Sequence, residues 1–192
     1  MVGFATYGLA LFVVLLLAGW WTARRGGPHT MAAALWAGAG TLVAVGVNQP
    51  IVTYNAEKRP YVVLPHSLLL VGRSADFSYP SDHAVMAGAV AIGLLLVSVR
   101  LGLLALLAAL VMAFARVYVG AHWPADVIAG LIVGSAVVLL GEVVFHAPLT
   151  RLVDRLERTP LRLLLTATPA RIHSCPDAPG AVPVRETREH LS

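Results

Sequence analysis

Five long runs of apolar residues, separated by short polar segments, make up most of the chain. They extend over residues 2–21, 31–52, 81–99, 103–119 and 123–145. Each run is close to the length of about 20 residues that a helix needs to cross the hydrocarbon core of a bilayer. The pattern therefore predicts an all-α fold, a polytopic bundle of about five transmembrane helices.

Local signals at the ends of these runs predict how the helices are connected. The third run begins sharply at Ser81-Asp82, a strong N-cap signal. The link at residues 100–102 is so short that the third and fourth helices must be antiparallel neighbours. Gly130 and Gly134 in the fifth run form a GxxxG pair, which allows another helix to approach closely.

Composition agrees with a membrane protein and excludes other classes. Hydrophobic residues make up 58% of the chain, charged residues only 12%, and the mean hydropathy is +0.77. A soluble domain carries about a quarter charged residues, so lipid must be the solvent for much of this chain. The basic residues are scattered between apolar runs, which argues against nucleic-acid binding. The lone cysteine, Cys175, excludes an internal disulfide.

The distribution of positive charge predicts the orientation. Lys and Arg concentrate on the cytoplasmic side of membrane proteins. With five spans, Arg24, Arg25, Arg100 and the seven arginines after residue 150 fall on one side. The other side keeps only Lys58, Arg59, Arg73 and Arg116. The N-terminus and the polar loop at residues 53–80 are therefore expected outside, and the C-terminal tail in the cytoplasm.

Three segments are expected along the chain. Residues 1–146 form the transmembrane domain, and the first run is a retained helix because no basic residue precedes it. Residues 147–165 place leucines and arginines on different helical faces, which predicts an amphipathic segment on the inner leaflet. Residues 166–192 are rich in Pro, Ala, Arg and Glu without periodicity, which predicts disorder.

Chemically active side chains collect at three places, all on the outer side. These are Arg59-Pro60, the segment Pro80-Ser81-Asp82-His83, and the set Arg116, His122 and Asp126. Ionisable groups near a membrane are costly to bury, so such clusters point to function.

Together these groups fit a bound phosphate. The start of the third helix offers free N–H groups, Ser81 adds a hydroxyl, and two guanidiniums can each grip phosphate oxygens. Asp126 lies four residues after His122, close enough to hydrogen-bond one ring nitrogen and leave the other free to attack phosphorus. His83 can protonate the departing oxygen.

Each cluster also has a structural interpretation: a helix-end turn, an N-cap, or a residue that suits the helix dipole. Short motifs taken singly favour that interpretation, but three clusters on one membrane face reverse it. Two other functions remain open from the residues. One is a binder or transporter of lipid phosphates without catalysis, which would tolerate loss of His122. The other is a metal site built from His83, His122 and Asp126.

These residues resemble the type 2 phosphatidic acid phosphatase superfamily, whose motifs are KxxxxxxRP, PSGH and SRxxxxxHxxxD. The matching positions are Arg59-Pro60, Pro80 to His83, and Arg116 with His122 and Asp126, within about residues 45–130. The resemblance implies a helical bundle and a metal-independent phosphatase that requires no cofactor. It assigns the nucleophile to His122, its orientation to Asp126, the acid to His83, and phosphate binding to Arg59, Ser81 and Arg116.

Three positions depart from the family pattern. Val52 replaces the motif lysine, and Ala115 replaces the motif serine. Asp82 replaces the motif glycine and is placed with the phosphate-binding residues, although its carboxylate would lie near an anion unless it turns away to cap the helix.

The PSDH form, an asparagine at Asn48 and the run from Asp76 to His83 are similar to the bacitracin-resistance branch of undecaprenyl-diphosphatases. That branch often carries sequence before its first span, so an N-terminal segment is expected to be missing here. The resemblance implies hydrolysis of undecaprenyl diphosphate at the periplasmic face of a bacterial inner membrane. Phosphatidic acid, phosphatidylglycerol phosphate and other prenyl phosphates are the alternative substrates. The oligomeric state is left open.

Overall fold

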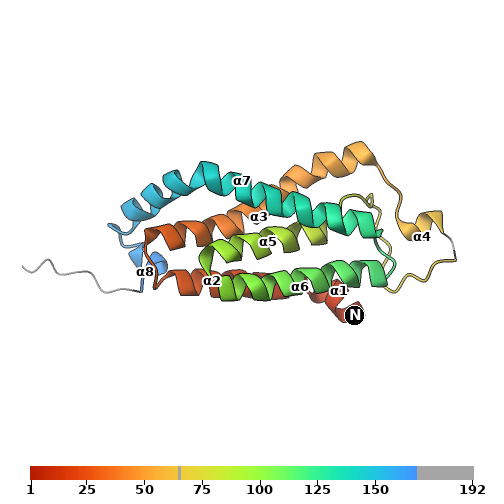
Figure 1. Cartoon of the computed structure of the whole chain (residues 1–192), viewed down its shortest axis with the longest axis horizontal. Coiled ribbons are helices and arrows are strands. Elements are labelled where there is room, and N and C mark those ends of the chain that lie inside the picture. Colours follow the sequence, from red (N-terminus) through yellow and green to blue (C-terminus); the bar gives the residue numbers. More distant parts are fainter. Residues whose placement is uncertain (65, 168–192) are drawn as a thin grey trace, which may run out of the picture.

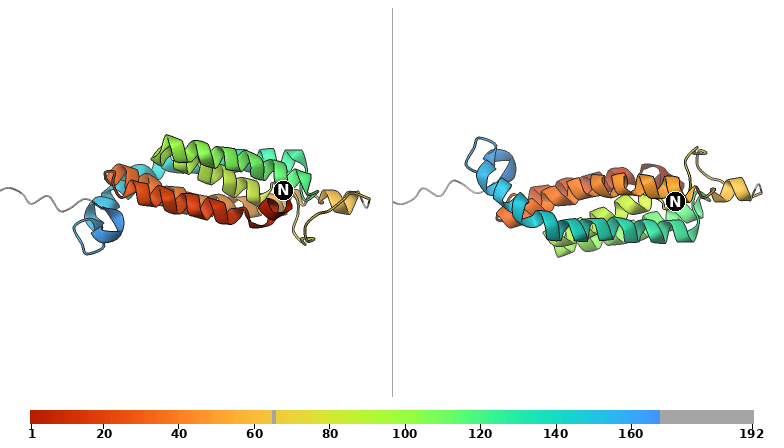
Figure 2. Two further views of the ribbon diagram at one scale, coloured as in Figure 1. Left: turned by 90° about the horizontal axis from the view of Figure 1, so that it is seen from below. Right: turned by 90° about the horizontal axis from the view of Figure 1, so that it is seen from above.

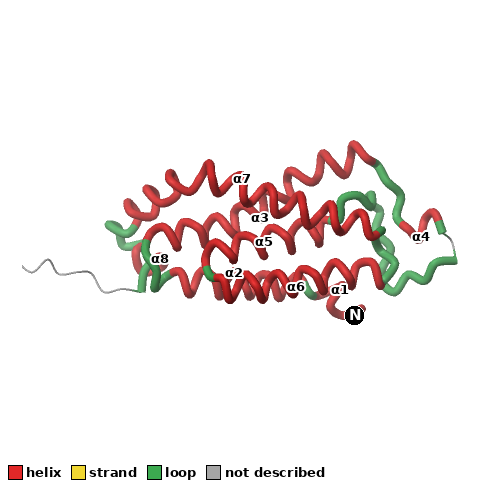
Figure 3. Tube along the Cα trace, viewed as in Figure 1, coloured by secondary structure: helices red, strands yellow, loops and turns green. Residues whose placement is uncertain are grey.

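The computed structural model describes residues 1–64 and 66–167, and within them the fold is entirely helical (Figures 1 and 3). The helices are α1 (Val2–Tyr7), α2 (Leu9–Ala23), α3 (Pro28–Asn55), α4 (Pro60–Val63), α5 (Asp82–Val97), α6 (Val99–Tyr118), α7 (Pro124–Leu156) and α8 (Arg162–Leu165). The five long helices lie roughly parallel in one elongated bundle (Figures 1 and 2). The predicted fold class is confirmed. The predicted disordered tail lies almost wholly outside the described residues.

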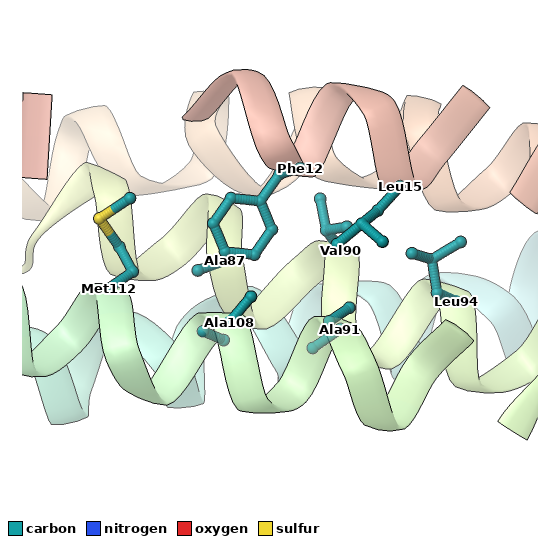
Figure 4. Close-up of a cluster of buried hydrophobic side chains, with 10 residues drawn as sticks. Phe12, Leu15, Ala87, Val90, Ala91, Leu94, Ala108 and Met112 are labelled. Atoms are coloured by element: carbon teal, nitrogen blue, oxygen red, sulfur yellow. The ribbon is translucent and has the colours of Figure 1, made fainter. Parts of the chain in front are cut away.

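Helix α5 is the centre of the bundle, because α2, α3, α6 and α7 all pack against it. One buried cluster joins α2, α5 and α6 through Phe12, Val90, Leu94 and Met112, interleaved with alanines (Figure 4). Small residues on α5 let its neighbours approach closely while the long side chains fill the remaining space. This packing fixes the start of α5 relative to the helices around it.

The closest approach is between α5 and α7, at the predicted GxxxG pair. A Cβ atom on Gly130 would lie 2.7 Å from the Ser81 carbonyl oxygen, and one on Gly134 would lie 2.0 Å from the Val85 carbonyl oxygen. Only glycine fits at these two positions, because any side chain would overlap the backbone of α5. The two helices therefore meet backbone to backbone just below the segment that begins α5.

Several predicted helix boundaries were wrong. The first run is divided at Gly8 into α1 and α2, and a Cβ atom at Gly8 would lie 2.7 Å from the side chain of Met112 in α6. The turn predicted at residues 100–102 belongs to α6, and Ser98 alone separates α5 from α6. Helix α7 does not end at Phe145. It runs on through Pro148 to Leu156, so much of the predicted amphipathic segment continues the last long helix.

The chain is a multi-pass membrane protein. Three helical segments are long and apolar enough to cross a bilayer, namely Pro28–Val63, Val99–Tyr118 and Pro124–Leu156. Helices α2 and α5 are apolar but shorter. The N-terminus, α4 and the turn between α6 and α7 lie at one end of the bundle, and α8 lies at the other (Figure 1). All three motif segments are at the end that carries the N-terminus.

Candidate active site

Four chain segments bring the motif residues together at one end of the bundle. Arg59 precedes α4, His83 lies in the first turn of α5, Arg116 lies in the last turn of α6, and His122 lies in the loop before α7. All four side chains line one cavity of about 200 Å³. Positions up to 63 residues apart in the sequence therefore face the same small space, as the three clusters predicted.

The hydrogen bonds of His122 define which ring nitrogen is free. Its Nδ1 lies 2.9 Å from the carbonyl oxygen of Ser78, which can only accept, so Nδ1 carries the proton. Its Nε2 lies 3.2 Å from Nη1 of Arg59, which can only donate, so Nε2 carries a lone pair. The buried imidazole thus presents an unprotonated nitrogen beside a guanidinium, which is the arrangement that a nucleophile requires.

Asp126 is fully buried at the start of α7, and its Oδ2 atom accepts several contacts. The hydroxyl of Ser78 and the backbone N–H of Trp123 both donate to it, the latter at 2.8 Å. His122 Nδ1 lies 3.4 Å from the same oxygen. The predicted contact of imidazole and carboxylate is present, but it is longer than the bond from His122 to the Ser78 carbonyl.

The two arginines are buried and have no carboxylate partner among the residues that the structure describes. Arg59 donates to the carbonyls of Asp76 and Ala121 as well as to His122. Arg116 donates from Nη1 to the carbonyl of Ala5, and its buried Nε has no partner. Guanidinium groups are costly to bury without a compensating negative charge, so the cavity that they line favours the binding of an anion.

Ser81 and His83 complete the side chains at the start of α5. Ser81 is fully buried, its N–H donates to the carbonyl of Asp126 at 3.1 Å, and its hydroxyl has no partner in the described structure. His83 lines both cavities and makes no hydrogen bond to the residues described. A free hydroxyl and a free imidazole are thus available to a ligand.

Asp82 points its carboxylate toward α3. Its Oδ1 accepts from the amide of Asn48 at 2.7 Å and from the amide of Gln49 at 3.1 Å. Although Asp82 lines the cavity, its carboxylate is bound to α3 and offers an anion no donor. This orientation argues against a phosphate-binding role for Asp82.

Lys58 is exposed and lies outside the residues that line the cavity. A second cavity of about 210 Å³ adjoins the first and shares Arg59, His83 and Arg116 with it. Thr6 of α1 and Tyr61 of α4 also line this second space. These hydroxyl-bearing side chains extend the polar surface beside the first cavity.

Burial shifts the protonation of His122. Removal from water lowers the pKa of this imidazole below its ordinary value, and the positive charges of Arg116 and Arg59 act in the same direction. The nearby carboxylate of Asp126 opposes the shift. The neutral form is therefore favoured, in agreement with the lone pair assigned to Nε2.

Ser78 and Asn48 contribute to this network without belonging to the three predicted clusters. Ser78 is fully buried and contacts both His122 and Asp126, whereas Asn48 contacts Asp82 and, at 3.3 Å, the Pro80 carbonyl. The only available signal was their place in the run from Asp76 to His83 and upstream of Arg59. No group of three His, Cys, Asp or Glu side chains within residues 1–64 and 66–167 is arranged to hold a metal ion.

At one end of this membrane helical bundle, a buried histidine with a free ring nitrogen and two arginines line one cavity, and within the described residues neither arginine has a carboxylate partner. This arrangement fits the class of integral-membrane proteins that act on phosphate groups. Residues 33–149 match the PAP2 superfamily, and the chain belongs to that family. The predicted resemblance is thereby confirmed.

Several curated relatives carry related names. The chain is 42% identical to an undecaprenyl-diphosphatase of Sulfolobus acidocaldarius over 42% of this chain and 39% of that protein. It is 31% identical to undecaprenyl-diphosphatase BcrC of Bacillus subtilis over 69% of this chain and 67% of that protein. It is 40% identical to a lipid A 1-phosphatase of Rhizobium johnstonii over 38% of this chain and 30% of that protein. Two of these matches thus span well under half of the relative. No solved structure matches the chain.

Proposed function

We propose that this chain is a membrane-bound lipid phosphatase that hydrolyses undecaprenyl diphosphate to undecaprenyl phosphate and inorganic phosphate. The observation that carries the proposal is the unprotonated Nε2 of His122 in a cavity lined by two arginines, neither of which has a carboxylate partner in the part of the chain that the structure describes. The names of the relatives from Sulfolobus acidocaldarius and Bacillus subtilis support the choice of substrate.

The first half of the reaction transfers the phosphoryl group to the protein. Nε2 of His122 attacks the terminal phosphorus, a P–N bond forms, and the P–O bond to the lipid phosphate breaks. The imidazolium of His83 gives its proton to the departing oxygen. Arg59, Arg116 and the hydroxyl of Ser81 donate to the non-bridging oxygens as charge moves onto them.

The second half releases phosphate and restores the protein. A water molecule attacks the phosphohistidine, the P–N bond breaks, and neutral His83 takes the proton of the water. Inorganic phosphate leaves, and His122 again has its lone pair on Nε2. Neither half requires a metal ion, because the guanidiniums and the N–H groups at the start of α5 supply the positive potential.

The face of the membrane on which this occurs follows from the arginine distribution. Arg24 and Arg25 lie between α2 and α3, at the end of the bundle opposite the cavity (Figure 1). The positive-inside rule places that end in the cytoplasm. We therefore infer a cavity at the periplasmic face of a bacterial inner membrane.

Phosphate release by purified protein tests the proposal. The substrates are undecaprenyl diphosphate, phosphatidic acid, phosphatidylglycerol phosphate and a short prenyl phosphate, each in mixed micelles. The expected result is fastest release from undecaprenyl diphosphate, with no release by the His122→Ala variant. His29→Ala removes an exposed histidine at the opposite end of the bundle and is expected to behave as wild type.

Two results would contradict the proposed substrate or the proposed mechanism. Faster release from a glycerophospholipid would exclude the diphosphate substrate but keep the enzyme class. Equal release by wild type and His122→Ala would exclude the histidine mechanism altogether. The same assay in EDTA separates the arginine-based mechanism from a metal site, since only the latter loses its activity.

A further inference from the structure

Ser78 lies in the loop before α5 and makes three hydrogen bonds to other segments of the chain. Its N–H donates to the carbonyl of Glu57 at 2.8 Å, its carbonyl accepts from Nδ1 of His122 at 2.9 Å, and its hydroxyl donates to Oδ2 of Asp126. The residue is fully buried, with no exposed surface. One residue thus contacts both members of the imidazole–carboxylate pair.

These contacts do two separate things. The carbonyl fixes the protonated nitrogen of His122 and therefore the tautomer, because a carbonyl can only accept. The hydroxyl supplies a donor to Asp126 Oδ2, which Trp123 N–H approaches at 2.8 Å and His122 Nδ1 at 3.4 Å. The Ser78 carbonyl is better placed than Asp126 for the first task, because it lies 2.9 Å from Nδ1 whereas the Asp126 oxygen lies 3.4 Å from it.

We propose that Ser78 is a positioning residue for phosphoryl transfer, which orients His122 through its carbonyl and holds the Asp126 carboxylate in place through its hydroxyl. This inference rests on the proposed function for its kinetic part, since it concerns the same histidine. Ser78 does not line the cavity and so acts through its neighbours without touching the substrate.

Removing the hydroxyl changes the charge balance around His122 in a definite direction. In wild type, Ser78 disperses part of the negative charge on Asp126 Oδ2. Without that donor, more negative charge remains on the carboxylate oxygen. This charge stabilises the imidazolium form of His122 relative to the neutral form. The other ionisable groups that face His122 or line its cavity are Arg59, Arg116, His83, Asp76 and Asp82. None of them contacts the Ser78 hydroxyl, so their effects remain the same.

A matched set of variants isolates the hydroxyl. Ser78→Thr and Ser78→Val have nearly the same shape and differ in the donor, while Ser78→Ala removes the hydroxyl without added bulk. Each keeps the backbone carbonyl. Ser67→Ala serves as the control, because Ser67 donates its hydroxyl to the Leu64 carbonyl within the same long loop and contacts neither His122 nor Asp126.

Two measurements are made on each full-length protein in detergent. The first is the titration of His122 by nitrogen NMR of labelled histidine, with the resonance assigned by its loss in His122→Gln. The second is the pH dependence of kcat and KM for phosphate release. In Ser78→Ala and Ser78→Val, His122 is expected to titrate at higher pH than in wild type. Both variants are expected to lose roughly 10- to 100-fold in kcat with little change in KM, by analogy with the loss of hydrogen-bond partners that orient metal-bound histidines. Ser78→Thr is expected to keep more of the kcat than Ser78→Val.

The outcomes separate this inference from the proposed function. If wild type releases no phosphate but the titration of His122 still moves in Ser78→Ala, the positioning contact stands and the function is wrong. If wild type is active and Ser78→Thr and Ser78→Val are equal in both titration and kcat, the inference is overturned. A loss of kcat in Ser78→Val with an unchanged titration would also overturn it, because the hydroxyl would then act only through the fold.

Discussion

Replacing Gly134 with alanine would put a methyl group where α5 and α7 touch. The new Cβ would lie 2.0 Å from the Val85 carbonyl oxygen and 2.9 Å from the Ala89 nitrogen. A relaxed contact between carbon and a carbonyl oxygen is about 3.3 Å or more, so the helices must separate by roughly 1 Å. Overpacking of this kind costs about 1–3 kcal/mol of stability.

The same displacement reaches the active site. Helix α5 carries His83 and Ser81, and α7 begins beside His122 with Asp126 in its first turn. Because a misplacement of about 1 Å can cost roughly 100-fold in rate, Gly134→Ala is expected to lose most of its activity even where it remains folded.

The assays are thermal unfolding in detergent and phosphate release, and the chain offers a matched control. Gly38 lies in the middle of α3, and a Cβ there would meet no atom within 4 Å. Gly38→Ala should therefore unfold at or above the wild-type temperature, since alanine favours the helix by roughly 0.5–1 kcal/mol. If Gly134→Ala matched Gly38→Ala in unfolding and in rate, the proposed backbone contact between α5 and α7 would be wrong.

Two further predictions concern the site. Burial lowers the pKa of His122, so the attacking imidazole remains neutral at pH values below its ordinary pKa of about 6.5. The acid limb of the pH profile of kcat/KM should accordingly lie below that pH; a limb well above it would contradict the burial of His122. Asn48→Ala removes a buried donor from Asp82, which should cost about 1–3 kcal/mol in thermal unfolding and raise KM as the freed carboxylate repels phosphate. The isosteric Asn48→Asp should raise KM further, and an unchanged KM in both variants would show that Asp82 does not face the anion.

Much of the fold could be predicted because its signal is local. Each apolar run is long enough to define a helix, and the GxxxG pair correctly marked the closest helix contact. The boundary errors at Gly8 and Phe145 arose because the local sequence is equally compatible with an unbroken first helix and with a last helix that ends at Phe145. The close approach of Met112 to Gly8 is a contact between distant segments that the local sequence does not reveal.

The residues that line the cavity could be predicted, but the hydrogen bonds between them and their neighbours could not. Motif spacing and topology indicated that Arg59, His83, Arg116 and His122 meet, and they line one cavity. Spacing could not show that His122 binds a backbone carbonyl more closely than it binds Asp126, because any residue supplies a carbonyl. The partners of Asp82 were equally hidden, since the amides that bind it lie more than 30 positions away on α3.

The most direct test of the account is to look for the covalent intermediate on His122. Wild-type protein and His122→Ala are mixed with undecaprenyl diphosphate carrying a radiolabelled terminal phosphate, denatured in alkali during turnover, and digested. Label is expected on the wild-type peptide that contains His122, stable in alkali and lost in acid, and no label is expected on the variant. Label on another residue, or phosphate release by the variant at the wild-type rate, would contradict it.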